Sequence, residues 1–234
     1  MKISIIIPTL NESEHISNLL NFLYANANNN VNEIIVIDGG SSDNTVELAK
    51  KNGVIVYTSS QKGRAAQMNF GANKATGDIL YFVHADSVPP PTYSFDVINT
   101  VKNDFQLGCY PFQFRSKKWL LKFNSWLTQF DKMCFRGGDQ TLFITRDLFN
   151  KINGYDTNFV IMEEYDLIKR ARKLAKFTII KTGAVSVSAR KYDLNSYWRI
   201  TIANFIAFTM FNIGKDPEKI LSTYLSIIQH PTES

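Results

Sequence analysis

Two apolar runs, each ending abruptly in small and polar residues, constrain the fold of this chain most strongly. Residues 4–12 read SIIIPTLNE, and residues 34–43 read IIVIDGGSSD. Uninterrupted isoleucine and valine are typical of strands buried on both faces, as in a parallel sheet covered by its crossover helices. In such open sheets, ligands bind beyond the carboxyl ends of the strands. The sequence therefore predicts an α/β fold whose function lies in the loops after these strands.

The first part of the chain continues this alternation of strands and helices. Apolar residues at 16, 19, 20 and 23 recur at helical spacing, which predicts one helix face that packs on the sheet. Asn11 with Glu14, and Asn44 with Glu47, have capping-box spacing, which predicts the starts of two helices. The expected strands are 3–7, 34–37, 54–57 and 79–83, and the expected helices are about 12–26, 44–52 and 64–75.

After three prolines at 89–91, the alternation gives way to a mixed segment rich in aromatic residues. No internal repeat or low-complexity linker divides the chain, so we expect one domain over residues 1–234. The elements expected here are helices over 92–103, 119–131, 163–175, 195–213 and 216–228, and strands over 107–115 and 141–145.

Composition excludes several classes of protein. The net charge of +5 suits an anionic ligand or a membrane surface, but it is small and no long basic block accompanies it, so no nucleic-acid partner is expected. Cys109 and Cys134 lack Cys-x-x-Cys spacing, which predicts ordinary thiols rather than disulfides or a zinc site. The amino terminus does not resemble a signal peptide, and we expect a cytoplasmic protein.

Asp38 ends the second predicted strand and is followed by two glycines. A carboxylate at this position can accept a hydrogen bond from a nucleotide base or a ribose hydroxyl, while the glycines let the backbone approach a ligand. The alternative is a turn of Asp-Gly type followed by helix capping. We assign Asp38 to ligand binding and Asp43 to capping.

Two further segments carry charge next to a predicted strand or helix end. Gly63 and Arg64 open a helix, where the guanidinium and the helix dipole both favour an anion; a solvated surface arginine is the alternative. His84 and Asp86 end the fourth strand and point the same way in an extended chain, so a divalent cation held together with diphosphate oxygens is feasible. Because magnesium prefers oxygen, we assign the metal to Asp86 and treat His84 as a hydrogen-bonding group.

Taken in order, these motifs resemble the family-2 glycosyltransferases. The resemblance rests on residues 8–12 (PTLNE), on residues 38–45 (DGGSSDNT), and on residues 84–86 (HAD), which stand where the family has its Asp-x-Asp motif. The second half resembles a bacterial branch named for association with radical-SAM and selenodomain proteins. Its marks are residues 138–140 (GDQ), 162–167 (MEEYDL), 188–190 (SAR) and 212–214 (NIG).

The resemblance implies a GT-A fold with a helical carboxyl-terminal extension and an inverting transfer of a sugar from a nucleotide diphosphate to an acceptor hydroxyl. It favours UDP and implies Mg²⁺ or Mn²⁺ bound by Asp86, Glu164 as general base beside Glu163, and Asp139 against the donor sugar or the acceptor. It divides the domain into a nucleotide-binding half (1–91), an acceptor and catalytic half (92–190) and the extension (191–234). The residues expected to line the nucleotide pocket are Pro8, Thr9, Asn11, Glu12, Asp38, Gly63, Arg64 and Asp86.

The chain departs from the family pattern at two positions. His84 replaces the first aspartate of the Asp-x-Asp motif, which leaves one carboxylate for the metal. Glu164 replaces the aspartate of the usual Glu-Asp pair, so the base has a longer side chain. Taken without the resemblance, acidic residues in the first turn of a helix are also what the helix dipole favours.

Two apolar helices leave an alternative open. The helix over 119–131 combines aromatic residues with Lys117, Lys118 and Lys122, and it fits either the protein core or contact with a membrane or a lipid-linked acceptor at the inner membrane face. Residues 200–213 are too short and too interrupted by asparagine to span a bilayer, and we expect a core helix there.

Two other functions compete with glycosyl transfer. A sugar nucleotidyltransferase would carry a glycine-rich basic loop after the first strand, and PTLNE is not one. A catalytically silent nucleotide-sugar-binding protein, associated with a membrane, would bind a donor without consuming it.

Overall fold

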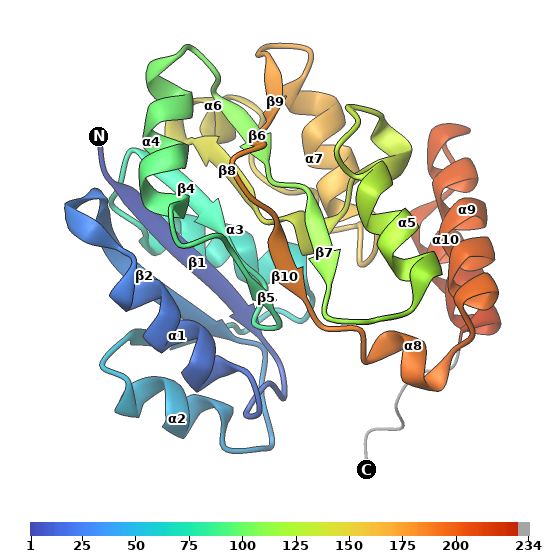
Figure 1. Cartoon of the computed structure of the whole chain (residues 1–234), viewed down its shortest axis with the longest axis horizontal. Helices are drawn as coiled ribbons and strands as arrows, with labels where there is room; N and C mark the ends of the chain where they lie inside the picture. Colours follow the sequence, from blue (N-terminus) through green and yellow to red (C-terminus); the bar gives the residue numbers. More distant parts are fainter. Residues whose placement is uncertain (229–234) are drawn as a thin grey trace.

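A computed structural model describes residues 1–228 and contains a central sheet with the strand order β3-β2-β1-β4-β8-β6-β9 (Figure 1). Strands β1 to β4 run parallel, and β8 pairs antiparallel with both β4 and β6. The strands of this sheet are β1 (Ile3–Thr9), β2 (Val31–Asp38), β3 (Ile55–Thr58), β4 (Ile79–Phe82), β6 (Leu107–Cys109), β8 (Leu142–Thr145) and β9 (Phe177–Ile179). The α/β fold predicted from the apolar runs is confirmed.

Helices cover both faces of the sheet, because the strand side chains alternate between two apolar cores. Ile5 and Ile7 belong to the core that contains α1 and α4, whereas Ile6 belongs to the core that contains α3, α6 and α7. The helices of the first 175 residues are α1 (Ile16–Ala25), α2 (Thr45–Lys51), α3 (Arg64–Lys74), α4 (Tyr93–Lys102), α5 (Trp119–Leu127), α6 (Arg146–Lys151) and α7 (Glu163–Ala171).

The strand predicted over 107–115 is wrong as a single element. Strand β6 ends at Cys109, and β7 (Phe112–Phe114) belongs to a second sheet with the order β5-β10-β7, which also contains β5 (Ser87–Val88) and β10 (Val185–Val187). Pro111 lies between β6 and β7, and proline has no amide hydrogen to continue a ladder. The small sheet adjoins the segment after β4, because Val187 pairs with Ser87.

The capping boxes predicted for α1 and α2 are also wrong. Helix α1 begins at Ile16, and Asn11, with φ 53°, lies in the left-handed region outside the helix. Its side-chain oxygen accepts a hydrogen bond from the Ser42 amide instead. Asn44 does precede α2, but its side chain makes no capping bond. Asn11 fails as a cap because its side chain bonds to the other loop. At the start of α2 the Thr45 amide donates instead to Asp43 Oδ1 at 3.0 Å, so the assignment of Asp43 to capping is confirmed.

The predicted closing helices are present as α9 (Tyr197–Asn212) and α10 (Pro217–Ile227), preceded by the short α8 (Lys191–Leu194). They pack against each other through a small separate core that includes Ala203, Ala207 and Ile220. The expectation that residues 200–213 form a core helix is correct for one face only, since Ile202 and Phe205 are exposed. In residues 1–228 we find no helix long and apolar enough to cross a membrane.

The contact between α3 and the sheet gives a test of this packing. A Cβ atom on Gly71 would lie 2.5 Å from a methyl group of Ile6 and 3.0 Å from Ile37. We expect Gly71→Val to lower the free energy of unfolding by roughly 1–3 kcal/mol through overpacking. Asn73→Val, on the exposed side of the same helix, is the matched control. Urea unfolding of both variants checks this, and equal midpoints would contradict the close approach.

Candidate active site

The loops after β1 and β2 are joined by hydrogen bonds into one surface at the carboxyl edge of the sheet. The Asn11 amide donates to Ser41 Oγ at 2.9 Å, and the Ser42 amide donates back to Asn11 Oδ1 at 2.9 Å. The Glu12 amide donates to Thr45 Oγ1 at 2.8 Å, a third link between the two loops. The two motifs that were separate in the sequence therefore form one structure.

Gln67 of α3 forms hydrogen bonds to the ends of both strands. Sequence reasoning gave this residue no role. Its side-chain amide donates to the carbonyl oxygens of Thr9 and Ile37, both at 2.8 Å, and is buried. Gly39 is required beside it, because a Cβ atom there would lie 2.9 Å from Gln67 Nε2. Gln67 thus ties the end of β1, where the predicted residues Pro8 and Thr9 lie, to β2 and α3.

Asp38 is buried at the end of β2, and its carboxylate is engaged within its own loop. Its oxygens accept hydrogen bonds from the amides of Gly40 and Ser41 and from the Ser41 hydroxyl. These bonds hold the loop in shape. The assignment of Asp38 to nucleotide binding stays a prediction.

The predicted anion-binding residue Arg64 meets the predicted acid Glu163. Gly63, with φ 103°, precedes α3, and Arg64 Nε lies 2.8 Å from Glu163 Oε1. Glu163 is fully buried, whereas the Arg64 side chain is 46% exposed. Burial raises the pKa of the Glu163 carboxyl to about 7, and the guanidinium opposes that shift. Arg64 thus keeps an exposed cation above a buried carboxylate.

Glu164, the predicted base, faces His84 instead. His84 Nε2 and Glu164 Oε1 are 3.4 Å apart, and both side chains are nearly buried. Burial acts to raise the pKa of Glu164, but hydrogen bonding to His84 and the charge of Arg64 outweigh it, so that pKa lies below its ordinary value. Adjacent glutamates thus have opposite pKa shifts, because burial prevails at Glu163, whereas the hydrogen bond from His84 and the charge of Arg64 prevail at Glu164.

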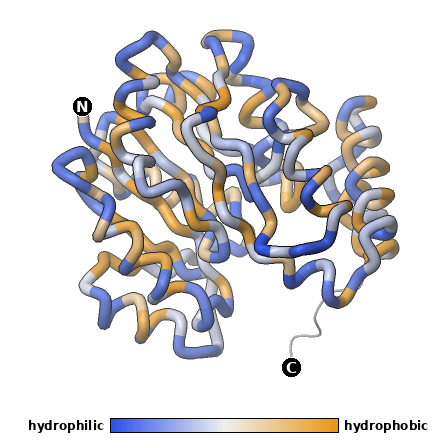
Figure 2. Tube along the Cα trace, viewed as in Figure 1, coloured by the Kyte–Doolittle hydropathy of each residue, from blue (hydrophilic) through white to orange (hydrophobic). Residues whose placement is uncertain are grey.

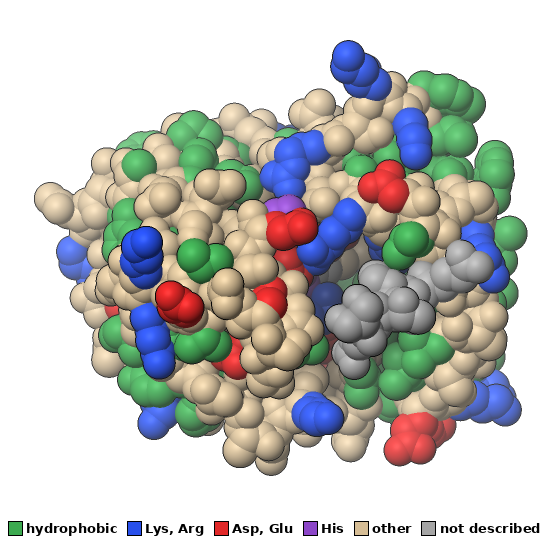
Figure 3. All heavy atoms as spheres, turned by 90° about the horizontal axis from the view of Figure 1, so that it is seen from below, with side chains coloured by type: hydrophobic (Ala, Val, Ile, Leu, Met, Phe, Trp, Pro, Cys, Tyr) green, Lys and Arg blue, Asp and Glu red, His purple; other side chains and the backbone are tan. Residues whose placement is uncertain are grey.

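Asp86 follows β4 and lies at the open side of this cluster. Its Oδ2 atom is 3.7 Å from Arg190 Nη2, and the same guanidinium nitrogen is 2.5 Å from Glu12 Oε1. Arg190 therefore connects the loop after β1 with the end of β4. Seen from below, acidic, basic and histidine side chains gather near the centre of the molecule (Figure 3).

Asp139, the third predicted acid, belongs to a short 3-10 helix before β8. Burial and the neighbouring Asp86 carboxylate raise its pKa, while His84, Lys191 and Arg64 act in the opposite direction. These influences place Asp139 in the same electrostatic cluster as the other predicted site residues.

The donor set suits a metal site completed by the substrate. Among residues 1–228, no group of three or more histidine, cysteine or acidic side chains is arranged to hold an ion. Magnesium is commonly bound by one or two carboxylates together with substrate phosphates, which is what Asp86 can offer. His84 is directed to Glu164 rather than to an ion beside Asp86.

A family model described as glycosyl transferase family 2 matches residues 4–164. This range contains the joined loops, Asp86, Asp139 and both buried glutamates. The chain belongs to glycosyltransferase family 2. It is therefore an enzyme of the transferase class, as the sequence motifs indicated.

Curated relatives are similar over part of their length. A dolichol-phosphate mannosyltransferase of Pyrococcus furiosus is 35% identical over 116 residues, which is 46% of this chain and 33% of that protein. A PGL/p-HBAD biosynthesis glycosyltransferase of Mycobacterium bovis is 26% identical over 179 residues, or 70% of this chain and 66% of that protein. The chain spans a third or less of the first relatives it matches.

Solved glycosyltransferases share the fold. The Staphylococcus aureus protein TarS, in complex with UDP-GlcNAc, has a TM-score of 0.69 at 16% identity, with 97% of this chain and 74% of that chain covered. The mannosyltransferase PcManGT of Pyrobaculum calidifontis, in complex with GDP-Man and Mn²⁺, has a TM-score of 0.67 at 17% identity, with 97% and 69% covered. The expected GT-A fold is confirmed.

The sequence named these candidate residues but not the side chains that contact them. Five of them lie close to one another or influence one another's pKa: Glu12, Arg64, Asp86, Asp139 and Glu164. Arg190 was noted only as part of a family mark, and its salt bridge to Glu12 was missed because the two residues are 178 positions apart. The one sequence signal for Arg190 is its position as a basic residue shortly after the strand β10.

The raised pKa of Glu163 predicts how stability depends on pH. The folded state holds the Glu163 proton up to about pH 7, whereas the unfolded chain releases it near pH 4.5, so wild-type stability falls as the pH rises between these values. Glu163→Gln has no such proton to lose. We expect the variant to gain roughly 2–3 kcal/mol relative to wild type between pH 5 and pH 8.

Urea unfolding at both pH values measures this gain. Glu47→Gln, which removes an exposed glutamate from α2, controls for the loss of a carboxylate. A constant difference between wild type and Glu163→Gln would show that Arg64 keeps Glu163 ionised throughout.

Proposed function

We propose that this protein is an inverting glycosyltransferase that moves a sugar from a nucleotide-diphosphate donor, with UDP favoured, to an acceptor hydroxyl. The observation that carries the proposal is the buried carboxylate of Glu164, held opposite His84 in one cluster with Asp86 and Asp139. Solved proteins of this fold in complex with UDP-GlcNAc or with GDP-Man and Mn²⁺ support a donor of this class. The marks in the second half support the branch named for radical-SAM association.

In the proposed reaction, Glu164 accepts the proton of the acceptor hydroxyl. The hydroxyl oxygen forms a bond to the anomeric carbon as the bond from that carbon to the diphosphate oxygen breaks on the opposite face. His84 holds Glu164 in place. Because the pKa of Glu164 lies below its ordinary value, Glu164 is ionised at neutral pH and able to take the proton.

The remaining residues bind the donor. Arg64 presents its exposed guanidinium to the departing diphosphate from the start of α3. Mg²⁺ or Mn²⁺ bound at Asp86 would supply further positive charge to that leaving group. The residues proposed for the nucleotide itself are Pro8, Thr9, Asn11, Glu12, Asp38 and Gly63, and Asp139 is proposed to contact the donor sugar or the acceptor.

We place the enzyme in the cytoplasm. We further propose that the hydroxyl acceptor is linked to a lipid. Support for this extension comes from α5, whose residues Trp119, Phe123 and Trp126 are exposed beside Lys117, Lys118 and Lys122. Peripheral contact with the inner face of a membrane would bring such an acceptor to the enzyme.

Substitution of the two adjacent glutamates tests the mechanism. Glu164→Gln keeps the size of the side chain but removes its basicity, so we expect donor affinity to be retained and turnover to fall by roughly 10²–10⁴-fold. Glu163→Gln should cost less, because Glu163 meets Arg64 and not the acceptor. Donor hydrolysis and transfer to an added acceptor give turnover. A dead Glu163→Gln with a nearly wild-type Glu164→Gln would move the base to Glu163, and two active variants would leave Asp139 as the base.

The metal role of Asp86 has its own test in donor binding. We expect Asp86→Ala to abolish the increase in UDP affinity that Mn²⁺ brings while thermal unfolding without ligand stays unchanged. His84→Ala should have a milder effect, and Asp147→Ala, which changes an exposed residue of α6, should have none. Titration calorimetry with UDP and with GDP, with and without Mn²⁺, measures all three and compares the bases. Full Mn²⁺-dependent affinity in Asp86→Ala would remove Asp86 as the ligand.

A further inference from the structure

Helix α9 is rich in apolar residues, and within residues 1–228 only one of its sides is buried. Ile200, Ala203 and Ala207 face the buried side, where α9 packs against α10. Figure 2 shows hydrophobic residues recurring along both helices.

The uncovered face of α9 is a row of large apolar side chains. Trp198, Ile202 and Phe205 are 63%, 51% and 69% exposed. Their spacing of i, i+4 and i+7 places them on one stripe of the helix, opposite Ala203 and Ala207 at about 100° per residue. This stripe adds apolar area that the sequence alone assigned to the core.

Helix α5 carries the same pattern at the same spacing. Trp119 is 72% exposed, and Phe123 and Trp126 follow at i+4 and i+7. The rings of Phe123 and Trp126 stack at 5.9 Å, and Trp126 meets Phe130 edge to face at 4.8 Å. Phe123, Trp126 and Phe130 therefore form one connected aromatic cluster.

The two helices are connected by a groove. Residues from the start of α5 and from α8 and α9 line a pocket of about 290 Å³: Lys118, Trp119, Leu120, Leu121, Tyr192, Ser196 and Tyr197. Tyr197 also contacts the ring of Trp198 at 5.3 Å, which continues the apolar surface onto the exposed stripe of α9. Figure 1 shows α5 and α9 on the same side of the molecule.

Charge is distributed unevenly around this surface. The chain has 21 acidic residues, but none lies between 105 and 130 or between 194 and 215. The basic residues of the two segments are Arg115, Lys117, Lys118, Lys122, Arg199 and Lys215. Basic residues therefore prevail on these two segments, although Asp193 of α8 is exposed next to Tyr192 of the groove. An excess of positive charge disfavours a second copy of the same surface and favours an anionic one.

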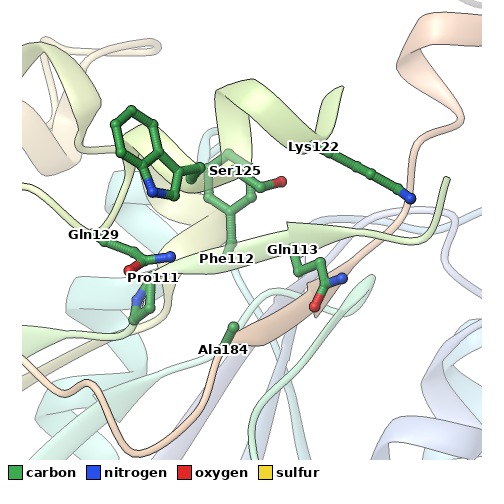
Figure 4. A pocket seen from close by; sticks show the side chains of 8 residues that line it. Pro111, Phe112, Gln113, Lys122, Ser125, Gln129 and Ala184 are labelled. Carbon is green, nitrogen blue, oxygen red and sulfur yellow. The ribbon is translucent and has the colours of Figure 1, made fainter. Parts of the chain in front are cut away.

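All three tryptophans of the chain lie on this surface. Tryptophan prefers the boundary between water and hydrocarbon, because its ring is apolar and its N–H group is polar. A pocket of about 310 Å³ between α5 and β7 adds polar groups at the edge, where Lys122 and Gln129 lie near Phe112 and Gln113 (Figure 4). This setting suits a lipid headgroup beside buried acyl chains.

We propose that the exposed faces of α5 and α9 form one docking surface for an anionic lipid bilayer. The aromatic residues enter the boundary region, and the lysines beside them meet anionic headgroups. The role of this surface, access to a lipid-linked acceptor, rests on the proposed function. Lipid binding itself can be measured without a donor, so it does not depend on catalysis.

Intrinsic fluorescence tests the proposal directly, since every tryptophan reports on the surface. The full chain is titrated with vesicles of mixed phosphatidylglycerol and phosphatidylcholine, and with vesicles of phosphatidylcholine alone. We expect a blue shift and quenching by brominated acyl chains with the anionic vesicles only, weakened by added salt. Absence of both changes at low salt would overturn the proposal.

Substitutions separate the contributions of the two helices. At about 1 kcal/mol for each lysine, Lys117→Gln, Lys118→Gln and Lys122→Gln together should weaken partitioning about 100-fold. Phe205→Asp on α9 should weaken partitioning by at least tenfold. Phe95→Asp, which changes a similarly exposed residue of α4, should leave partitioning unchanged. Binding that survives Phe205→Asp would remove α9 from the surface.

Two controls distinguish failure here from other failures. UDP binding by each variant, measured without vesicles, shows that the fold and the donor site are intact, so loss of lipid binding is scored separately from loss of the proposed transfer. Sedimentation velocity without lipid tests the competing occupant. A dimer that Phe205→Asp dissociates would assign the surface to a second copy and overturn the membrane proposal.

Discussion

The carbonyl oxygens at the ends of β1 and β2 are held by one buried side chain, and the geometry of the site depends on it. Gln67 donates to the carbonyl oxygens of Thr9, the last residue of β1, and of Ile37, the residue before the end of β2. Leaving such a buried group unpaired costs about 1–3 kcal/mol. The same contact requires glycine at position 39. The two loops are bonded to each other through Asn11, and Gln67 ties the strand ends that precede them to α3.

Next to this edge of the sheet, two neighbouring carboxyl groups of α7 contact different side chains. Glu163 lies under Arg64 of α3, and Glu164 lies against His84 at the end of β4. The pKa of the first rises and that of the second falls, although they are adjacent in one helix turn. Pairs of acids whose environments shift their pKa values apart are typical of sites where one group must be ionised and ready to accept a proton. Position along the helix alone would not distinguish them.

Long apolar runs allowed the fold to be predicted, and contacts between distant residues limited the prediction. Strands β1, β2 and β4 were expected because a run of isoleucines has few alternatives to a buried strand. Strands β5, β9 and β10 have two or three residues each, too few for a periodic pattern. The predicted site residues followed from their places after strand ends. Their partners, Arg64 with Glu163 and Arg190 with Glu12, join segments whose separation carries no signal in a single sequence. The failed caps have the same origin, since Asn11 bonds to Ser42 across two loops.

Helix α9 shows another limit of prediction from sequence. Its apolar pattern fits a helix buried by its own chain and equally a helix buried against a partner or a membrane. Burial by the chain accounts for Ala203 and Ala207, whereas Trp198 and Phe205 stay in water. The distribution of acids decides between these readings. Glu12, Asp86, Asp139, Glu163 and Glu164 gather where cations and a phosphate-bearing donor are expected, while the segments around α5 and α9 contain no acid. A surface that only had to stay in water would gain solubility from acidic residues. Their absence beside exposed tryptophan is consistent with selection for contact with anionic headgroups, on a side of the molecule built from other elements than the catalytic cluster.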